Sequence, residues 1–172
     1  ILDADAMLNY PDFRSYEQAF MMMAQVSGRA GRKDKRGRVF LQTTHADLPV
    51  IKQVVSNDYE GFYHDLLDER RAFHYPPFYR LVYVYLKHGK EQQVETAAFE
   101  MGSRLRYFFG ARVLGPDNPA VARVKTMHIR KLVIKLENGI DIYKVRACLR
   151  KAQTEMSKDK QHAALQIFYD VD

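Results

Sequence analysis

The alternation of apolar and polar residues divides the chain into three sections. In the first, residues 1–46, apolar residues at helical spacing predict a helix from Ser15 to Gly28 between two segments of strand composition, residues 1–5 and 38–43. The buried face of this helix is expected to carry Ala19, Phe20, Met23 and Ala24. A strand, a helix and a second strand in this order are typical of a parallel α/β sheet.

The second section, residues 47–77, is predicted to be a helical connector. Asp47 and Asp58 each precede an apolar run at helical spacing, where a carboxylate can cap the first turn. The second helix must end at Pro76-Pro77, because proline lacks the backbone N–H that a helix uses and restricts the residue before it. These prolines mark the expected domain boundary.

The third section, residues 78–172, alternates between strand and helix patterns. We expect, in chain order, a strand over 79–88, a helix over 91–109, a short extended segment at 113–116, a hairpin of strands 121–125 and 130–136, a helix with an apolar stripe from Val145 to Met156, and a strand over 165–171. The order βαββαβ predicts a ferredoxin-like α+β domain. The chain is therefore expected to be an α/β section followed by an α+β domain.

Charge is concentrated in two places. The chain has 27 basic and 21 acidic residues, a net charge of +6. Residues 29–38 contain six basic residues and one acid, and residues 123–135 contain five basic residues and no acid, which together give +10. Two concentrated basic segments are typical of a surface that binds a polyanion.

Composition excludes several other functions. No apolar run reaches the length of a membrane span, so no membrane association is expected. The single Cys148 excludes an internal disulfide and a cysteine-rich zinc site, and the six histidines lack metal-ligand spacing, so we assign no metal. Because Ile1–Asp5 reads as a strand already in progress, we expect the chain to be a piece of a longer protein.

The most specific pattern is Gln25-Val26-Ser27-Gly28-Arg29-Ala30-Gly31-Arg32. Gly28 and Gly31 would let the backbone turn sharply after the helix, and Arg29 and Arg32 would project from a short, rigid stretch. An arginine fork can bind phosphate oxygens and the charge that develops on a transferred phosphoryl group. The alternative is a basic turn that is merely exposed to water.

This pattern resembles motif VI of superfamily 2 helicases, Q-x-x-G-R-x-G-R. Its flanks resemble one family of these enzymes, the primosomal protein N′ (PriA) family of replication-restart DNA helicases. The similar residues run along the whole chain and include Leu2-Asp3-Ala4-Asp5, Glu17, Asp58-Tyr59-Glu60, Glu69-Arg70-Arg71, Tyr75-Pro76-Pro77-Phe78-Tyr79-Arg80, Val113-Leu114-Gly115-Pro116 and Asp170-Val171-Asp172. The resemblance implies the end of a RecA-like helicase lobe, lobe 2, followed by the family's C-terminal domain.

The resemblance also implies roles for the motif. Arg32 would be the arginine finger that reaches the γ-phosphate of ATP, Arg29 would assist it, and Gln25 would link the nucleotide state to the interface between lobes. This sequence has no G-x-x-x-x-G-K-[ST] phosphate loop, no D-E-x-H magnesium motif and no cysteine-rich zinc module. ATP, Mg²⁺ and zinc would therefore be bound by other parts of the full-length protein, and the fragment alone is expected to be inactive.

The parent protein would, by the same resemblance, be a cytoplasmic, nucleoid-associated bacterial enzyme. It would unwind forked DNA in the 3′→5′ direction and restart replication by assembling the primosome. Its expected partners are forked and single-stranded DNA, the acidic C-terminal tail of single-stranded DNA-binding protein, and other primosome proteins.

The predicted hairpin is the second candidate site. Its basic residues Arg123, Lys125, Arg130 and Lys131 are expected to bind DNA or a partner. The resemblance implies that an Arg and a Gln on this hairpin serve the acidic tail in relatives. Met127 and Lys131 stand nearest those positions here, and Arg130 or His128 would be the expected substitutes. The alternative is a hairpin whose charges simply face water.

Two further alternatives stay open in the sequence. Tyr75, Phe78, Tyr79, Tyr83 and Tyr85 could stack on bases, but alternating aromatics are more often core, and we predict core for most of them. The rival to a helicase is a non-enzymatic nucleic-acid or protein-docking module whose basic turn meets no nucleotide. A phosphate loop upstream of Ile1 would decide for the enzyme.

Overall fold

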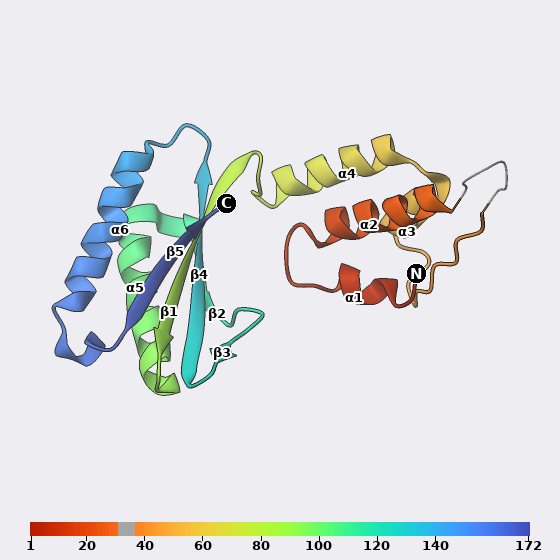
Figure 1. Ribbon diagram of the computed structural model, residues 1–172. Helices are drawn as coiled ribbons and strands as arrows, with labels where there is room; N and C mark the ends of the chain where they lie inside the picture. The colour runs from red at the N-terminus through yellow and green to blue at the C-terminus, as the bar shows by residue number, and fades with distance from the viewer. Residues whose placement is uncertain (31–36) are drawn as a thin grey trace. The chain divides into compact units, whose positions relative to one another are not determined.

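The computed structural model describes residues 1–30 and 37–172, which form two compact units (Figure 1). The first unit spans Ile1–Phe73 and the second spans His74–Asp172. The division follows the end of a helix and precedes Pro76-Pro77, close to the boundary that the two prolines predict. Each unit has a hydrophobic core of its own.

The described residues of the first unit form a small helical core. Its helices are α1 (Ala4–Leu8), α2 (Ser15–Arg29), α3 (Pro49–Ser56) and α4 (Tyr59–Ala72). All of them contribute to one cluster of buried residues, which contains Ala4, Leu8, Ala19, Phe20, Met23, Val50, Ile51, Phe62 and Leu66. The expected connector helices α3 and α4 therefore share a core with α2, the helix that leads into the arginine motif.

The prediction of two strands in this unit, over residues 1–5 and 38–43, is wrong. Residues 1–5 lead instead into α1, and Asp3 is the N-cap of that helix. Residues 38–43 are not in a regular strand, although Gln42 accepts a backbone hydrogen bond from Ala4 at 3.0 Å. The pairing stops there because α1 turns the neighbouring segment into a helix, so capping chemistry overrides the local strand propensity.

Helix ends in this unit match the sequence expectation at α4 but not at α3. The Asp58 carboxylate accepts a hydrogen bond from the Gly61 N–H at 2.9 Å and caps α4, as expected. Helix α3 begins after Leu48, with Pro49 in its first turn, so the cap expected at Asp47 is wrong. Helix α4 ends at Ala72, before the prolines.

The second unit is an α+β domain with a five-stranded antiparallel sheet. Its elements are β1 (Tyr79–His88), α5 (Glu91–Phe109), η1 (Gly110–Arg112), β2 (Val113–Asp117), β3 (Arg123–Val124), β4 (Met127–Glu137), α6 (Ile142–Ser157), η2 (Lys160–His162) and β5 (Gln166–Val171). The expected order of strands and helices is confirmed, and β1 and α5 have the predicted bounds.

The sheet has the strand order β2-β4-β1-β5, with the short β3 paired to β4. Strand β4 pairs along all of β1, from Tyr79 opposite Glu137 to His88 opposite His128. Strand β5 pairs with the other side of β1. Because directly opposite residues share a face and successive residues alternate, this register determines which side chains lie together.

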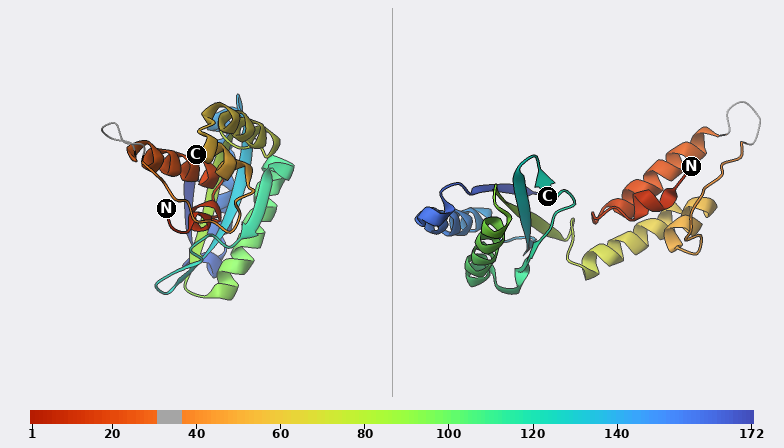
Figure 2. Two further views of the ribbon diagram at one scale, coloured as in Figure 1. Left: turned by 90° about the vertical axis from the view of Figure 1, so that its right-hand side faces the viewer. Right: turned by 90° about the horizontal axis from the view of Figure 1, so that it is seen from below.

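Helices α5 and α6 lie on the same face of the sheet (Figure 2). The core between them and the sheet contains Val82, Val84, Leu86, Val94, Ala97, Ala98, Met101, Leu105, Phe109, Val113, Leu132, Ile134, Leu136, Val145, Leu149, Ala152 and Met156. Within residues 74–172, all of which are described, the opposite face of the sheet carries no helix. On this face Tyr83, Tyr85 and Lys131 are half-buried.

Candidate functional site

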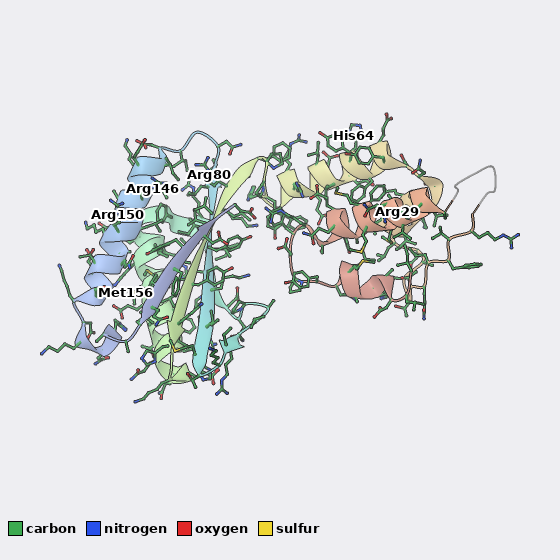
Figure 3. All side chains as sticks on the ribbon, in the orientation of Figure 1. Arg29, His64, Arg80, Arg146, Arg150 and Met156 are labelled. Atoms are coloured by element: carbon green, nitrogen blue, oxygen red, sulfur yellow. The ribbon has the colours of Figure 1, made fainter. Side chains whose placement is uncertain are left out.

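Helix α2 carries the described part of the arginine motif. Gln25, Gly28 and Arg29 are all exposed, and Figure 3 shows Arg29 near the C-terminal end of the helix. Gln25 and Arg29 are four residues apart, so their side chains lie one above the other on one helix face. That face lies away from the buried stripe of α2, so the two polar groups are presented to solvent.

Gly28 does not end the helix, contrary to the sequence expectation. Helix α2 continues to Arg29, and the Ala30 N–H then donates to the Ser27 carbonyl at 3.1 Å. Apart from its chain neighbours and the nearby backbone of its own helix, no atom of the described residues lies within 4 Å of the position that a Cβ would take at Gly28. Gly31 and Arg32, the second predicted glycine and the predicted finger, lie outside the described residues.

Helix α2 is held against α4 by an ion pair and by stacked rings. Arg70 Nη2 lies 2.6 Å from Glu17 Oε2, and the Arg70 side chain is only 13% exposed. The same guanidinium lies 5.3 Å from the centroid of the Phe13 ring. Phe20 of α2 stacks on Phe62 of α4 with ring centroids 4.1 Å apart. These contacts fix the helix whose outer face presents the motif.

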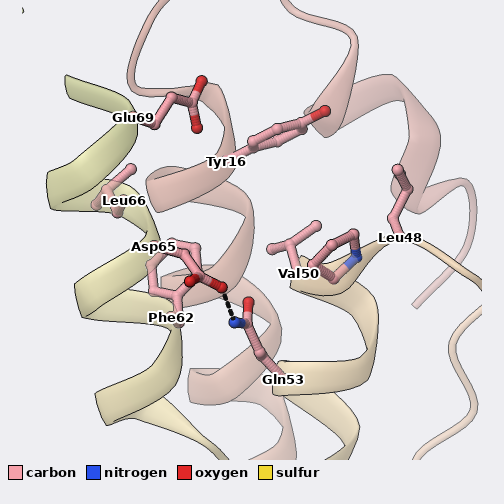
Figure 4. A pocket seen from close by; sticks show the side chains of 9 residues that line it. Tyr16, Leu48, Val50, Gln53, Phe62, Asp65, Leu66 and Glu69 are labelled. Atoms are coloured by element: carbon pink, nitrogen blue, oxygen red, sulfur yellow. Dashed lines mark hydrogen bonds between the residues drawn. The ribbon is translucent and has the colours of Figure 1, made fainter. Parts of the chain in front are cut away.

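An apolar pocket of about 240 Å³ lies between α2, α3 and α4 (Figure 4). Its polar rim includes Gln53, whose Nε2 donates to Asp65 Oδ2 at 2.6 Å. The lining residues are Tyr16, Leu48, Pro49, Val50, Gln53, Phe62, Asp65, Leu66 and Glu69. Because this lining has two carboxylates and no basic side chain, the pocket is unsuited to a phosphate.

The predicted hairpin is confirmed, with a different turn. Strand β3 pairs with the first two residues of β4, which leaves Lys125 and Thr126 as a two-residue turn. Lys125 has a φ of 55°, in the left-handed region that such turns use. Arg123 Nε donates to the Lys125 carbonyl at 3.1 Å. The paired part of β3 thus ends at Val124, and Lys125 lies in the turn rather than in the strand.

Arg130 is buried against α5 and paired there. Its side chain is 10% exposed, its Nε donates to Glu95 Oε2 at 2.7 Å, and its Nη2 donates to Glu91 Oε1 at 3.0 Å. Burial opposes the charge, but the hydrogen bonds to Glu91 and Glu95 outweigh it and raise the pKa of Arg130. A guanidinium already paired with two carboxylates cannot readily meet a phosphate. This geometry argues against the expected DNA contact through Arg130.

Lys131 faces the other side of the sheet from Arg130. It lies opposite Tyr85 in the pairing of β4 with β1, and its Nζ is 5.7 Å from the centroid of the Tyr83 ring. The predicted basic residues therefore do not form one patch. Lys125 lies at the hairpin turn, while Arg130 and Lys131 point to opposite faces of β4.

His128 and Arg130, the suggested substitutes for binding an acidic tail, both lie beside carboxylates of α5. His128 Nδ1 is 3.8 Å from Glu91 Oε2, and the same carboxyl group bonds Arg130. The hydrogen bond from Arg130, with the nearby His128, lowers the pKa of Glu91, so this carboxyl stays negatively charged near neutral pH. An acidic peptide would meet that negative charge here.

The core prediction is wrong for Tyr83 and Tyr85. Both are half-buried on the sheet face away from α5 and α6, and their ring centroids are 6.2 Å apart. Sequence reasoning missed two neighbours on this face, Phe168 and Lys87. Phe168 lies opposite Tyr85, and Lys87 Nζ is 4.7 Å from the centroid of the Phe168 ring. Along β5, Ile167 and Tyr169 pack against the core, so the residue between them, Phe168, faces the other side of the sheet. The alternation in the sequence could have identified Phe168 in this way.

Two features are absent from residues 1–30 and 37–172. In that part of the chain, no three His, Cys, Asp or Glu side chains gather as a metal site requires. Over the same residues, no helix has both the length and the apolar character to cross a membrane. Cys148 is half-buried and packs against the core of the second unit.

The α+β unit matches a known class of domain. Residues 71–172 match the family model described as primosomal protein N C-terminal domain, which covers more than half of the chain and the whole sheet. The second unit is therefore a C-terminal domain of this class.

The similarity continues through the helical unit. The chain is 33% identical over 173 residues to replication restart protein PriA of Bacillus subtilis, covering 99% of this chain and 21% of that protein. It is 31% identical over 144 residues to PriA of Synechocystis sp., covering 83% of this chain and 17% of that protein. It is 30% identical over 152 residues to PriA of Thermotoga maritima, covering 88% of this chain and 20% of that protein. The chain belongs to the PriA family, and it spans about a fifth of the length of these relatives.

Proposed function

We propose that the chain is the C-terminal part of an ATP-dependent 3′→5′ DNA helicase that recognises stalled or abandoned forks and restarts replication by assembling a primosome. The observation that carries this proposal is the presence, in one chain, of the motif from Gln25 to Arg32 and the family's C-terminal domain. The relatives' name, replication restart protein PriA, supports the cellular role. That role belongs at the bacterial chromosome, in the cytoplasm.

The proposed fold assignment has two parts. We assign the first unit to the end of a RecA-like lobe 2, because its helix α2 leads into the arginine motif. We assign the second unit to the ferredoxin-like class, because β1, α5, β2, β4, α6 and β5 follow the βαββαβ order, with β3 as an insertion.

In this proposal the arginines act on the terminal phosphate of ATP. Arg29 ends α2 in solvent, where its planar fork can donate two hydrogen bonds to phosphate oxygens. Arg32 would stabilise the charge that develops on the γ-phosphoryl group, as arginine fingers do. Gln25, on the same helix face as Arg29, would sense whether nucleotide is bound.

The chain can supply only one side of such a nucleotide site. It offers arginines, while its sequence contains no phosphate loop and no magnesium motif. ATP and Mg²⁺ would therefore be held chiefly by other residues of the longer protein, and Mg²⁺ would neutralise phosphate charge during transfer. Zinc, too, would belong to another part, since Cys148 is the chain's single cysteine.

The C-terminal domain would contribute DNA and partner binding. Arg123 and Lys125 are exposed at the hairpin, and Lys131 lies on the open side of the sheet, so cations are offered to phosphates from two directions. The partners that this proposal includes are forked and single-stranded DNA, the acidic tail of single-stranded DNA-binding protein, and other primosome proteins.

The test is the DNA-stimulated ATPase activity of the full-length parent protein. Arg32→Ala should lower kcat on the order of 10³-fold with DNA affinity unchanged, and Arg32→Lys should restore little because a point charge does not reproduce the fork. Arg38→Ala, an exposed arginine of the same basic segment, is the matched control and should keep its activity. The 172-residue chain alone should show no turnover. If Arg32→Ala stays within a few-fold of wild type, the assignment of Arg32 as the arginine finger is wrong.

A further inference from the structure

The sheet face opposite α5 and α6 combines aromatic rings with lysines. Strand alternation and register place Tyr83, Tyr85, Lys87, Lys131, Val133 and Phe168 on this surface, which we name the open face. The hydrophobic core lies on the other side of the same strands. The open face is thus a surface of the second unit alone, built on three neighbouring strands, β4, β1 and β5.

The rings of the open face form a small platform. Tyr83 and Tyr85 alternate along β1, and Phe168 lies opposite Tyr85 on the edge strand β5. Phe168 is 46% exposed, which leaves much of an apolar ring in water. Tyr83 and Tyr85 are half-buried beside it. Burying more of the Phe168 ring against a partner would be favourable.

The lysines lie beside these rings. Lys87 Nζ is 4.7 Å from the Phe168 ring centroid, and Lys131 Nζ is 5.7 Å from that of Tyr83. Three acids also lie on this side: Asp170, opposite Tyr83; Asp117, paired in register with Lys131 at the other edge of the sheet; and Glu137, opposite Tyr79 and paired with Arg112 at 2.8 Å. The end of the platform around Tyr85 and Phe168 is therefore the part that offers a ring pair flanked by ammonium groups.

This composition discriminates between classes of partner. The centre of a protein–protein interface is depleted in lysine, so two lysines set among the rings do not suit a protein. Bases in a duplex are stacked on each other and cannot reach a flat sheet. A single strand offers both unstacked bases for the rings and phosphates for the lysines.

We propose that the open face binds single-stranded DNA, with bases stacked on Tyr85 and Phe168 and phosphates paired with Lys87 and Lys131. The inference rests on the proposed DNA-binding function and assigns a strand preference and a surface to it. Binding of this kind has no sequence preference, because every base has a π-face.

The experiment is fluorescence anisotropy of the 172-residue chain on three labelled ligands of equal length: single-stranded oligo-dT, the same strand with abasic sites, and a duplex. Phe168→Leu and Tyr85→Leu keep apolar bulk and remove a ring. Each should weaken oligo-dT binding at least about fivefold, the lower limit for the removal of one base–aromatic stack. Neither should change duplex affinity by more than about twofold. On the abasic strand wild type and variants should bind alike, because no base remains to stack.

Controls separate stacking from folding and from charge. Tyr143→Ala removes a ring that is 77% exposed on α6 and should leave all three affinities unchanged. Lys87→Gln combined with Lys131→Gln should reduce the slope of log K against log salt by about 0.7 for each phosphate that the protein no longer neutralises. Thermal unfolding followed by far-UV circular dichroism identifies any variant that fails to fold. Phe168→Leu should disturb the fold least, because Phe168 lies on an edge strand.

Two outcomes overturn the inference. One is unchanged oligo-dT affinity in both ring variants. The other is an equal loss of affinity for oligo-dT and for the abasic strand, which would mean that the rings act through the fold. If wild type binds DNA but the ring variants behave like wild type, only the open face is refuted. If wild type binds no DNA at all, the proposed DNA-binding function fails with it.

Discussion

Removing the Arg130 side chain should destabilise the C-terminal domain without affecting DNA binding directly. The guanidinium joins β4 to the first turns of α5 through Glu91 and Glu95, and its Nη1 also donates to the carbonyl of Ile129 at 3.1 Å. We compare Arg130→Ala, which removes both the charge and the aliphatic stem, with Arg130→Met, which keeps an apolar stem of similar length.

The magnitude follows from the exposure of the partners. Glu91 and Glu95 are 62% and 44% exposed, so water screens each ion pair, and the pairs together contribute about 0.5–2 kcal/mol rather than the 3–5 kcal/mol of a fully buried pair. The buried stem adds about 0.8 kcal/mol for each methylene. Arg130→Met should therefore lower the free energy of unfolding by about 0.5–2 kcal/mol, and Arg130→Ala by about 2–4 kcal/mol.

The assay is urea denaturation followed by far-UV circular dichroism, with hydrogen exchange of amides in α5 and β4 to assign the loss of stability to the second unit. High salt should shrink the Arg130→Met effect, because it screens the pairs that this variant lacks. Arg146→Ala, an exposed arginine on α6 (Figure 3), is the control and should stay within about 0.5 kcal/mol of wild type. An Arg130→Ala effect as small as that of the control would refute the buried pair and return Arg130 to the set of DNA-binding candidates.

Two further predictions concern stability. Tyr169→Phe should raise the free energy of unfolding by up to about 1 kcal/mol, which urea denaturation would show as a higher midpoint. Burial raises the pKa of Tyr169 to about 12, and its hydroxyl has no hydrogen-bond partner among the described residues. A lowered midpoint would contradict this prediction. Hydrogen bonds from Thr43 and Thr44 lower the pKa of Asp5 from 3.8 to about 2, so its stabilising effect is full above pH 4 and is lost toward pH 2. Asp5→Asn should thus lower the melting temperature at pH 7, and the difference in melting temperature between wild type and variant should narrow below pH 4. A difference that stays constant with pH would contradict the assigned role of the Asp5 carboxylate.

The second unit was largely predictable because its signals are local. Alternation over Tyr79–His88 and helical spacing over Glu91–Phe109 are strong patterns, and both elements have the predicted bounds. The hairpin was predictable too, but not its turn residue, since Lys125 lacks the glycine or asparagine that usually marks a left-handed position.

The failures depend on contacts that no local pattern contains. Alternation cannot tell which strand face the helices cover, so it gives no reason to exclude Tyr83 and Tyr85 from the core. Arg130 looked like an available cation because its partners are distant in sequence, on α5. In the first unit, the Asp3 cap turned an apparent strand into α1.

The central claim, that this chain binds DNA through exposed cations of its C-terminal domain, is tested most directly by its salt dependence. The measurement is the anisotropy of labelled forked DNA titrated with the 172-residue chain at several salt concentrations. Log K should fall linearly with log salt, with a slope of about 0.7 to 0.9 per neutralised phosphate, and Arg123→Ala combined with Lys125→Ala should flatten that slope for every DNA sequence alike. An affinity and a slope that the double variant leaves unchanged would show that the hairpin is only a solvated surface, and no binding at low salt would contradict the claim as a whole.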